Sequence, residues 1–112
     1  RHRGDTYAIY ELAQTEYNLG NLKQAEMLFT QAAAELSENA QIFYDLGKVS
    51  ADLGKEQASR FYLGKYYLFK GKITVAKRYL KGAAQHAEVP EVLRNEAQAI
   101  LDTLKELEKN EE

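Results

Sequence analysis

Apolar residues recur along most of the chain at intervals of three and four, the spacing that places side chains on one face of an α-helix. The pattern divides into six stripes separated by short polar or glycine-containing stretches. It predicts helices over roughly residues 5–19, 22–37, 40–53, 56–70, 72–87 and 90–109. Because the connections are only a few residues long, neighbouring helices must run antiparallel. The pattern therefore predicts an all-α chain of about six helices.

Single residues mark the predicted helix ends. Gly20, Gly54 and Gly71 each lie where one stripe stops and another starts, the usual place for a left-handed residue that closes a helix. Asn21 and Asn39 are predicted to cap the helices that follow them.

A short motif occurs three times in the chain. It consists of a leucine, a small residue directly after it and a glycine eight positions after the leucine, and it begins at Leu12, Leu46 and Leu63. The first two copies are 34 residues apart, which is the length of a tetratricopeptide repeat. The third copy follows after 17 residues, half of that period.

Two segments resemble complete tetratricopeptide (TPR) repeats. The resemblance is carried in the first by Leu12-Ala13, Asn18-Leu19-Gly20-Asn21, Ala25, Phe29 and Ala32, and in the second by Leu63-Gly64, Tyr67, Gly71, Ala76, Leu80 and Ala83. It implies an antiparallel helix-hairpin solenoid that forms one domain over residues 1–112. The expected parts are repeat 1 at 6–39, an extra first helix at 40–55, a repeat-like hairpin at 56–88 and a C-terminal capping helix at 90–109. The half-period step leaves open which layer helix 56–70 joins.

Small residues at fixed places predict close helix crossings, where a larger side chain would push the helix axes apart. The expected contact points are Ala13, Ala25, Ala32, Gly47, Gly64, Ala76 and Ala83.

The chain carries few residues suited to catalysis. It has no cysteine, and its two histidines, His2 and His86, are not part of any metal-binding or catalytic motif. No glycine-rich phosphate loop and no nucleophile elbow are present. The longest uncharged stretch, Met27 to Ala34, is too short to cross a membrane. We therefore expect no catalytic residues, metal or cofactor, and because the chain begins at Arg1, we expect it to be part of a longer protein.

Charge is distributed unevenly along the chain. Residues 48–81 carry a net charge of +7, whereas residues 1–47 carry −4 and residues 82–112 carry −5. Solvated helix faces without a partner are the simpler explanation of this charge, and the functional alternative is a basic patch for an acidic peptide or a carboxyl terminus. Nucleic acid is a poorer candidate because the net charge of the whole chain is −2.

Candidate binding residues follow from the repeat offsets. Tyr10, Tyr44 and Phe61 are equivalent under offsets of 34 and 17 residues, and so are Gln14, Lys48 and Lys65. The TPR resemblance implies that such positions on the first helices line a concave groove, and Phe61 is expected in the core because the register breaks before it. The predicted groove residues are Tyr10, Gln14, Tyr17, Tyr44, Lys48 and Lys65. Core packing is the alternative for Tyr10 and Tyr44.

Three functions are compatible with this sequence. The first is a module that binds a protein or peptide, carrying acidic groups, through the groove. The second is the tail of a larger enzyme, because the run from Tyr44 through Tyr62 to Leu80 is similar to tails that follow bacterial zinc peptidases of the His-Glu-x-x-His class. The third is homo-oligomerisation through the last helix, whose stripe of Leu93, Ile100, Leu104 and Leu107 is suited to self-pairing.

Overall fold

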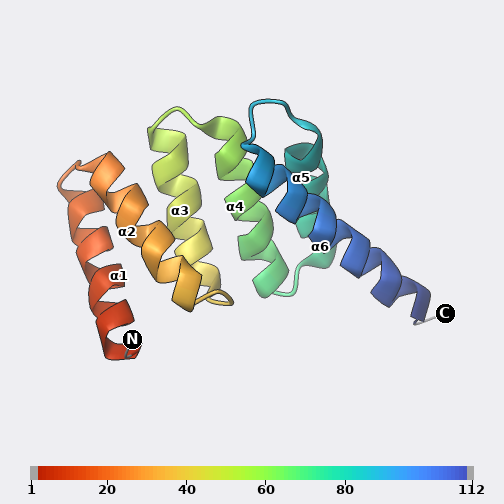
Figure 1. Ribbon diagram of the computed structural model, residues 1–112, viewed down its shortest axis with the longest axis horizontal. Coiled ribbons are helices and arrows are strands. Elements are labelled where there is room, and N and C mark those ends of the chain that lie inside the picture. The colour runs from red at the N-terminus through yellow and green to blue at the C-terminus, as the bar shows by residue number, and fades with distance from the viewer. Residues whose placement is uncertain (1–2, 111–112) are drawn as a thin grey trace.

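The computed structural model describes residues 3–110, which fold into six α-helices joined by short turns (Figure 1). They are α1 (Arg3–Asn18), α2 (Leu22–Glu35), α3 (Ala40–Asp52), α4 (Glu56–Phe69), α5 (Ile73–Gln85) and α6 (Glu91–Asn110). No strand occurs among the described residues, and the predicted all-α class is confirmed. Each predicted helix end lies within two residues of the observed one.

Helices α1 to α5 are arranged in space in the order in which they follow along the chain, and α6 begins beside α4 and crosses α5 (Figure 1). Each one packs against the next in alternating direction, and α4 also contacts α6. The resulting array measures 47 × 32 × 21 Å. This elongated shape leaves long faces of the array open to solvent.

Glycine closes three of the helices in the same way. Gly20, Gly54 and Gly71 have φ angles of 84°, 81° and 79°, a conformation that costs glycine little because it has no Cβ. In each case the amide after the glycine donates a hydrogen bond to the carbonyl five residues earlier, at 2.8–2.9 Å. These hydrogen bonds satisfy carbonyl groups at the end of each helix that would otherwise lack a donor.

The predicted caps differ in outcome. Asn39 accepts a hydrogen bond from the Ile42 amide at 3.3 Å and caps α3 as predicted. The prediction for Asn21 is wrong, because its side chain makes no capping bond and instead donates to Glu16 Oε2 at 2.8 Å. Asn21 belongs to the tight turn after Gly20 and has a ψ of 71°, whereas Asn39 has the more extended ψ of 105° from which its side chain reaches the helix.

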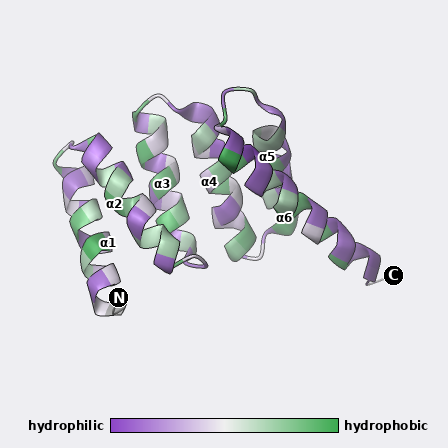
Figure 2. Cartoon of the chain, viewed as in Figure 1, coloured by the Kyte–Doolittle hydropathy of each residue, from purple (hydrophilic) through white to green (hydrophobic). Residues whose placement is uncertain are grey.

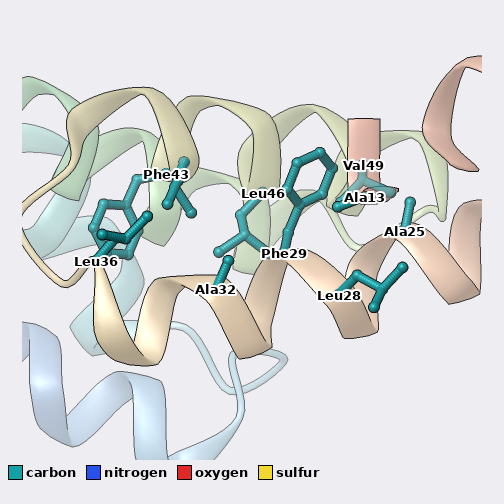
Figure 3. Packing of buried hydrophobic residues seen from close by; sticks show 10 residues of the cluster. Ala13, Ala25, Leu28, Phe29, Ala32, Leu36, Phe43, Leu46 and Val49 are labelled. Carbon is teal, nitrogen blue, oxygen red and sulfur yellow. The ribbon is translucent and has the colours of Figure 1, made fainter. Parts of the chain in front are cut away.

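The first of two core clusters joins α1, α2 and α3 (Figure 3). Its buried members are Ala13, Ala25, Leu28, Phe29, Ala32, Leu36, Ile42, Phe43, Leu46 and Val49. Their burial removes apolar surface from water, which is the main force that holds the helices together.

The second cluster joins α4, α5 and α6. Its buried members are Phe61, Leu80, Ala83, Val89 and Ala97, and Leu93 and Ile100 of α6 pack against them. The expectation that Phe61 is a core residue is confirmed by its exposure of 1%. The C-terminal part of α6 extends past the other helices and is mostly hydrophilic (Figures 1 and 2).

Small residues occupy the close helix crossings, as the sequence predicts. The predicted alanines are fully buried: Ala13, Ala25, Ala32, Ala76 and Ala83. At Gly47 of α3, a Cβ atom would lie 3.2 Å from Leu63 of α4. At Gly64 of α4, it would lie 2.9 Å from Leu80 of α5. Glycine is therefore what lets α4 approach both of its neighbours closely.

Candidate interaction surface

Five of the six predicted groove residues come from two helices whose side chains meet. Tyr10, Gln14 and Tyr17 lie on α1, and Tyr44 and Lys48 lie on α3. Their spacing along each helix places them on one face. Helix α2 packs against both α1 and α3 and so holds them at the distance at which these side chains touch.

A buried aspartate ties Tyr10 to α3. The Tyr10 hydroxyl donates to Asp45 Oδ2 at 2.6 Å, and Gln41 Nε2 donates to Asp45 Oδ1 at 3.2 Å. The Tyr10 ring packs against Phe29 with 5.9 Å between ring centroids. Burial, reinforced by the bonded carboxylate, raises the pKa of Tyr10 far above its ordinary value. Tyr10 therefore remains a neutral donor that joins the two helices.

Lys48 lies between two tyrosine rings. Its Nζ atom is 5.2 Å from the centroid of the Tyr17 ring and 5.3 Å from that of Tyr44, within range of a cation–π attraction. The same Nζ lies 3.9 Å from Asp45 Oδ1. Tyr17 is held in place because its hydroxyl donates to Asp52 Oδ2 at 2.5 Å, a bond that, with burial, raises the pKa of Tyr17. Lys48 is thus a positioned cation with 44% of its side chain exposed.

A cavity of about 250 Å³ opens beside Lys48. Its lining residues are Gln14, Tyr17, Asn18, Phe29, Asp45 and Lys48. One carboxylate and one ammonium face this space, so their charges offset each other. We call it the α1–α3 cavity.

Tyrosine rings continue from Tyr44 across α4 to α5. The ring centroids are 5.2 Å apart for Tyr44 and Tyr66, and 5.0 Å apart for Tyr66 and Tyr67. Tyr67 and Tyr79 stack at 5.6 Å with an angle of 17° between their planes. With the Lys48 contacts, these rings form an unbroken series over four helices, which we call the aromatic row: Tyr17, Lys48, Tyr44, Tyr66, Tyr67 and Tyr79.

Sequence reasoning did not assign three members of the aromatic row. Tyr66 and Tyr67 lie on the helix whose layer the half-period step leaves open, and Tyr79 lies on the helix after it. The repeat offsets that relate Tyr10 to Tyr44 select Phe61 on α4 instead. The high density of tyrosine between residues 62 and 79 is the one available signal, and it does not say which rings meet.

A larger cavity, of about 480 Å³, lies where α3, α4 and α5 meet. Its lining residues are Ala51, Glu56, Ser59, Arg60, Leu63, Arg78, Tyr79 and Gly82. Tyr79 belongs both to this cavity and to the aromatic row. We call it the α3–α5 cavity.

Lys65, the sixth predicted groove residue, lies on α4, and its side chain contacts residues outside the aromatic row. Its Nζ forms an ion pair with Glu96 Oε2 of α6 at 2.5 Å and lies 4.4 Å from the centroid of the Phe43 ring and 5.8 Å from that of Phe61. Only 13% of its side chain is exposed. The structure therefore does not bring Lys65 together with the aromatic row, and its charge is neutralised by the last helix.

Acidic residues from the flanking segments pair with part of the basic segment 48–81. Lys55 binds Glu26 at 3.0 Å, Lys65 binds Glu96, and Lys77 binds Glu108. These pairs join residues about thirty positions apart in the chain. They neutralise three lysines that, from the sequence alone, would be counted as free positive charges for binding a partner.

Side chains suited to metal binding are not clustered in residues 3–110, where no three His, Cys, Asp or Glu side chains converge. None of the helices in this range has the length and apolar character needed to span a membrane. His86 directly follows α5, and its Nδ1 accepts a hydrogen bond from the Glu88 amide at 3.1 Å. His2 lies outside the described residues.

No protein-family model matches the chain, and comparisons with curated proteins and with solved structures also give no match.

Proposed function

We propose that the chain is a TPR-like helical module that binds an extended segment of a protein or peptide along the aromatic row. The observation that carries this proposal is the continuity of the row, which crosses four helices and touches a cavity near each end. A surface of this length matches an extended chain better than a compact small molecule.

The chemistry of the row suits such a ligand. Tyrosine offers a large flat contact area and loses little side-chain entropy on binding, because it has only two rotatable side-chain bonds. Tyr17 and Lys48 are already ordered by hydrogen bonding and ring contacts. Because these groups are held in place before the partner arrives, the ordering cost of binding is reduced.

Two further observations favour this proposal over self-association. The TPR resemblance implies a concave groove, and its predicted residues on α1 and α3 adjoin the row. In addition, Leu93 and Ile100, which belong to the apolar stripe considered for self-pairing, pack inward against the second core cluster. Two of the four residues of that stripe are therefore used within the chain, where they cover α4 and α5, whereas Leu107 is exposed.

The experiment that tests the proposal is selection from a random twelve-residue peptide library displayed on phage, with the whole chain immobilised. Selected peptides are synthesised, and their dissociation constants are measured by fluorescence anisotropy for the parent chain, Tyr44→Ala and Tyr67→Ala. Met27→Ala is the matched control, because Met27 is an exposed apolar residue on α2, which contributes nothing to the row.

We expect both tyrosine variants to bind roughly tenfold more weakly or worse, as truncation of an aromatic anchor usually does. The Met27 variant should bind like the parent. Peptides that bind all four proteins equally would show that the row is not the site. Sedimentation at several protein concentrations tests self-association through α6 in the same samples.

A further inference from the structure

The α3–α5 cavity contains two arginines that no acid of the described chain neutralises. Arg60 of α4 and Arg78 of α5 are both exposed on its wall. Within residues 3–110 neither has a carboxylate oxygen within 4.0 Å. Four lysines of the same basic segment do have such a partner: Lys48, Lys55, Lys65 and Lys77. Two of the five cations of this segment that lack such a partner therefore line the same hollow in the surface.

One acidic side chain shares the cavity. Glu56 lies on the same wall but forms no ion pair with either arginine at 4.0 Å or less. The three charged residues of the wall thus leave an excess of one positive charge. The other walls are the apolar side chain of Leu63, the ring of Tyr79 and the small residue Gly82.

The two guanidinium groups favour a carboxylate as the ligand of this cavity. Arginine presents a planar fork of N–H donors that matches the two oxygens of a carboxylate, and the resulting bonds are stronger than those between neutral groups. Arg60 and Arg78 come from adjacent helices that are held together at the Gly64 crossing. The helices thus fix the separation of the two arginine backbones, and only the side chains must adjust to the ligand.

The cavity is connected to the aromatic row through a shared residue. Tyr79 stacks on Tyr67 in the row and also forms part of the cavity wall. A peptide that lies on the row can therefore place a side chain or its terminus into the cavity. At the opposite end, Lys48 lies beside Asp45, so the two ends of the row differ in their affinity for an anion.

We propose that the α3–α5 cavity binds a carboxylate of the partner segment, from an aspartate, a glutamate or the C-terminus, through Arg60 and Arg78. This deepens the proposed function and rests on it for the identity of the partner as a peptide. The anion site itself is testable without any peptide.

The first test uses succinate as the probe. The side-chain N–H signals of the arginines and the backbone amides are followed by ¹⁵N NMR while succinate is added to the whole chain, with sodium chloride at matched ionic strength as the blank. We expect saturable shifts confined to Arg60, Arg78 and the cavity amides. Arg60→Gln and Arg78→Gln should each weaken the binding about fivefold or more. Lys70→Gln removes an exposed cation at the end of α4 and should leave it unchanged.

Other outcomes of this titration overturn the proposal. Shifts spread evenly over all cations, or equal in the Lys70 and arginine variants, would show unspecific ion screening. Saturable binding of inorganic phosphate without binding of succinate would assign the cavity to a phosphorylated ligand instead.

The second test separates this proposal from the proposed function. Selected peptides are resynthesised with each Asp and Glu replaced by Asn and Gln and with an amidated C-terminus, one change at a time. One of these changes should weaken binding to the parent but not to Arg78→Gln. If tyrosine variants weaken peptide binding and no acidic change does, the row stands and the carboxylate site is refuted. If the reverse holds, the cavity stands and the row is refuted.

Discussion

A single methyl group at Gly64 tests how closely α4 and α5 cross. In Gly64→Ala, the new Cβ would lie 2.9 Å from Leu80 Cδ2, 3.0 Å from Leu80 Cγ and 3.2 Å from Tyr79 Cβ. All three distances are shorter than ordinary contact between carbon atoms. Leu80 is fully buried in the second core cluster, and Cβ of Tyr79 moves only with its backbone. The helices must therefore separate to admit the methyl group.

Two opposing effects set the size of the change. Replacing glycine by alanine within a helix stabilises it by about 1 kcal/mol, because alanine has less backbone freedom to lose. Overpacking a tight contact costs roughly 1–3 kcal/mol. Because the contact of 2.9 Å places the cost at the upper end of this range, we expect Gly64→Ala to lower the free energy of unfolding by about 1–2 kcal/mol, with a fall in Tm of roughly 4–8 °C for each kcal/mol.

Two other helical glycines provide the matched series. At Gly47, the new Cβ would lie 3.2 Å from Leu63, which is only half-buried and can move, so the gain and the cost should nearly cancel. At Gly82, no atom lies within 4 Å, and alanine should stabilise the chain by about 0.5–1 kcal/mol. Thermal and urea unfolding followed by circular dichroism measure all three variants.

The order of stability among the three variants tests how closely α4 and α5 cross at Gly64. The expected order is Gly82→Ala above the parent, Gly47→Ala near it and Gly64→Ala below it. If Gly64→Ala is as stable as Gly82→Ala, the crossing is not as close as described. A smaller cost of Gly64→Ala in a Leu80→Ala background would identify Leu80 as the side chain that the methyl group meets.

Three further predictions concern polar groups. Ser50→Ala should leave the stability unchanged or raise it, because its buried hydroxyl lacks a partner, whereas Ser59→Ala should cost about 1 kcal/mol in urea unfolding, since its hydroxyl has a buried acceptor. Glu96→Gln should cost about 1–2 kcal/mol in the same assay because Lys65 then loses its ionic partner; no loss would show the pair to be dispensable. Burial raises the pKa of Tyr62 to about 12. Stability should therefore fall above pH 10, where the unfolded tyrosine ionises first, and in Tyr62→Phe it should fall less steeply.

Local information in the sequence determined the helices of this protein. The intervals between apolar residues select one face of each helix, and glycine at a left-handed position ends a helix without help from distant residues. Both kinds of signal act within one or two turns, which is why the helix ends at Gly20, Gly54 and Gly71 could be predicted. The failure at Asn21 has a local cause too, because one turn closes α1 and starts α2, and its backbone angles decide what the side chain reaches.

The tertiary structure alone decided which side chains share a surface. Repeat offsets related Lys65 to Lys48, yet Glu96, 31 residues away, pairs with Lys65 beneath the last helix. Conversely, Arg60 and Arg78 carry no distinguishing pattern in the sequence and meet at one cavity because α4 and α5 are adjacent. Such meetings depend on the rotation of each helix about its axis and on the distance between the axes. Both the rotation and the distance are set by the packing of side chains that are remote in the chain. They cannot be predicted from the spacing of apolar residues within a single helix.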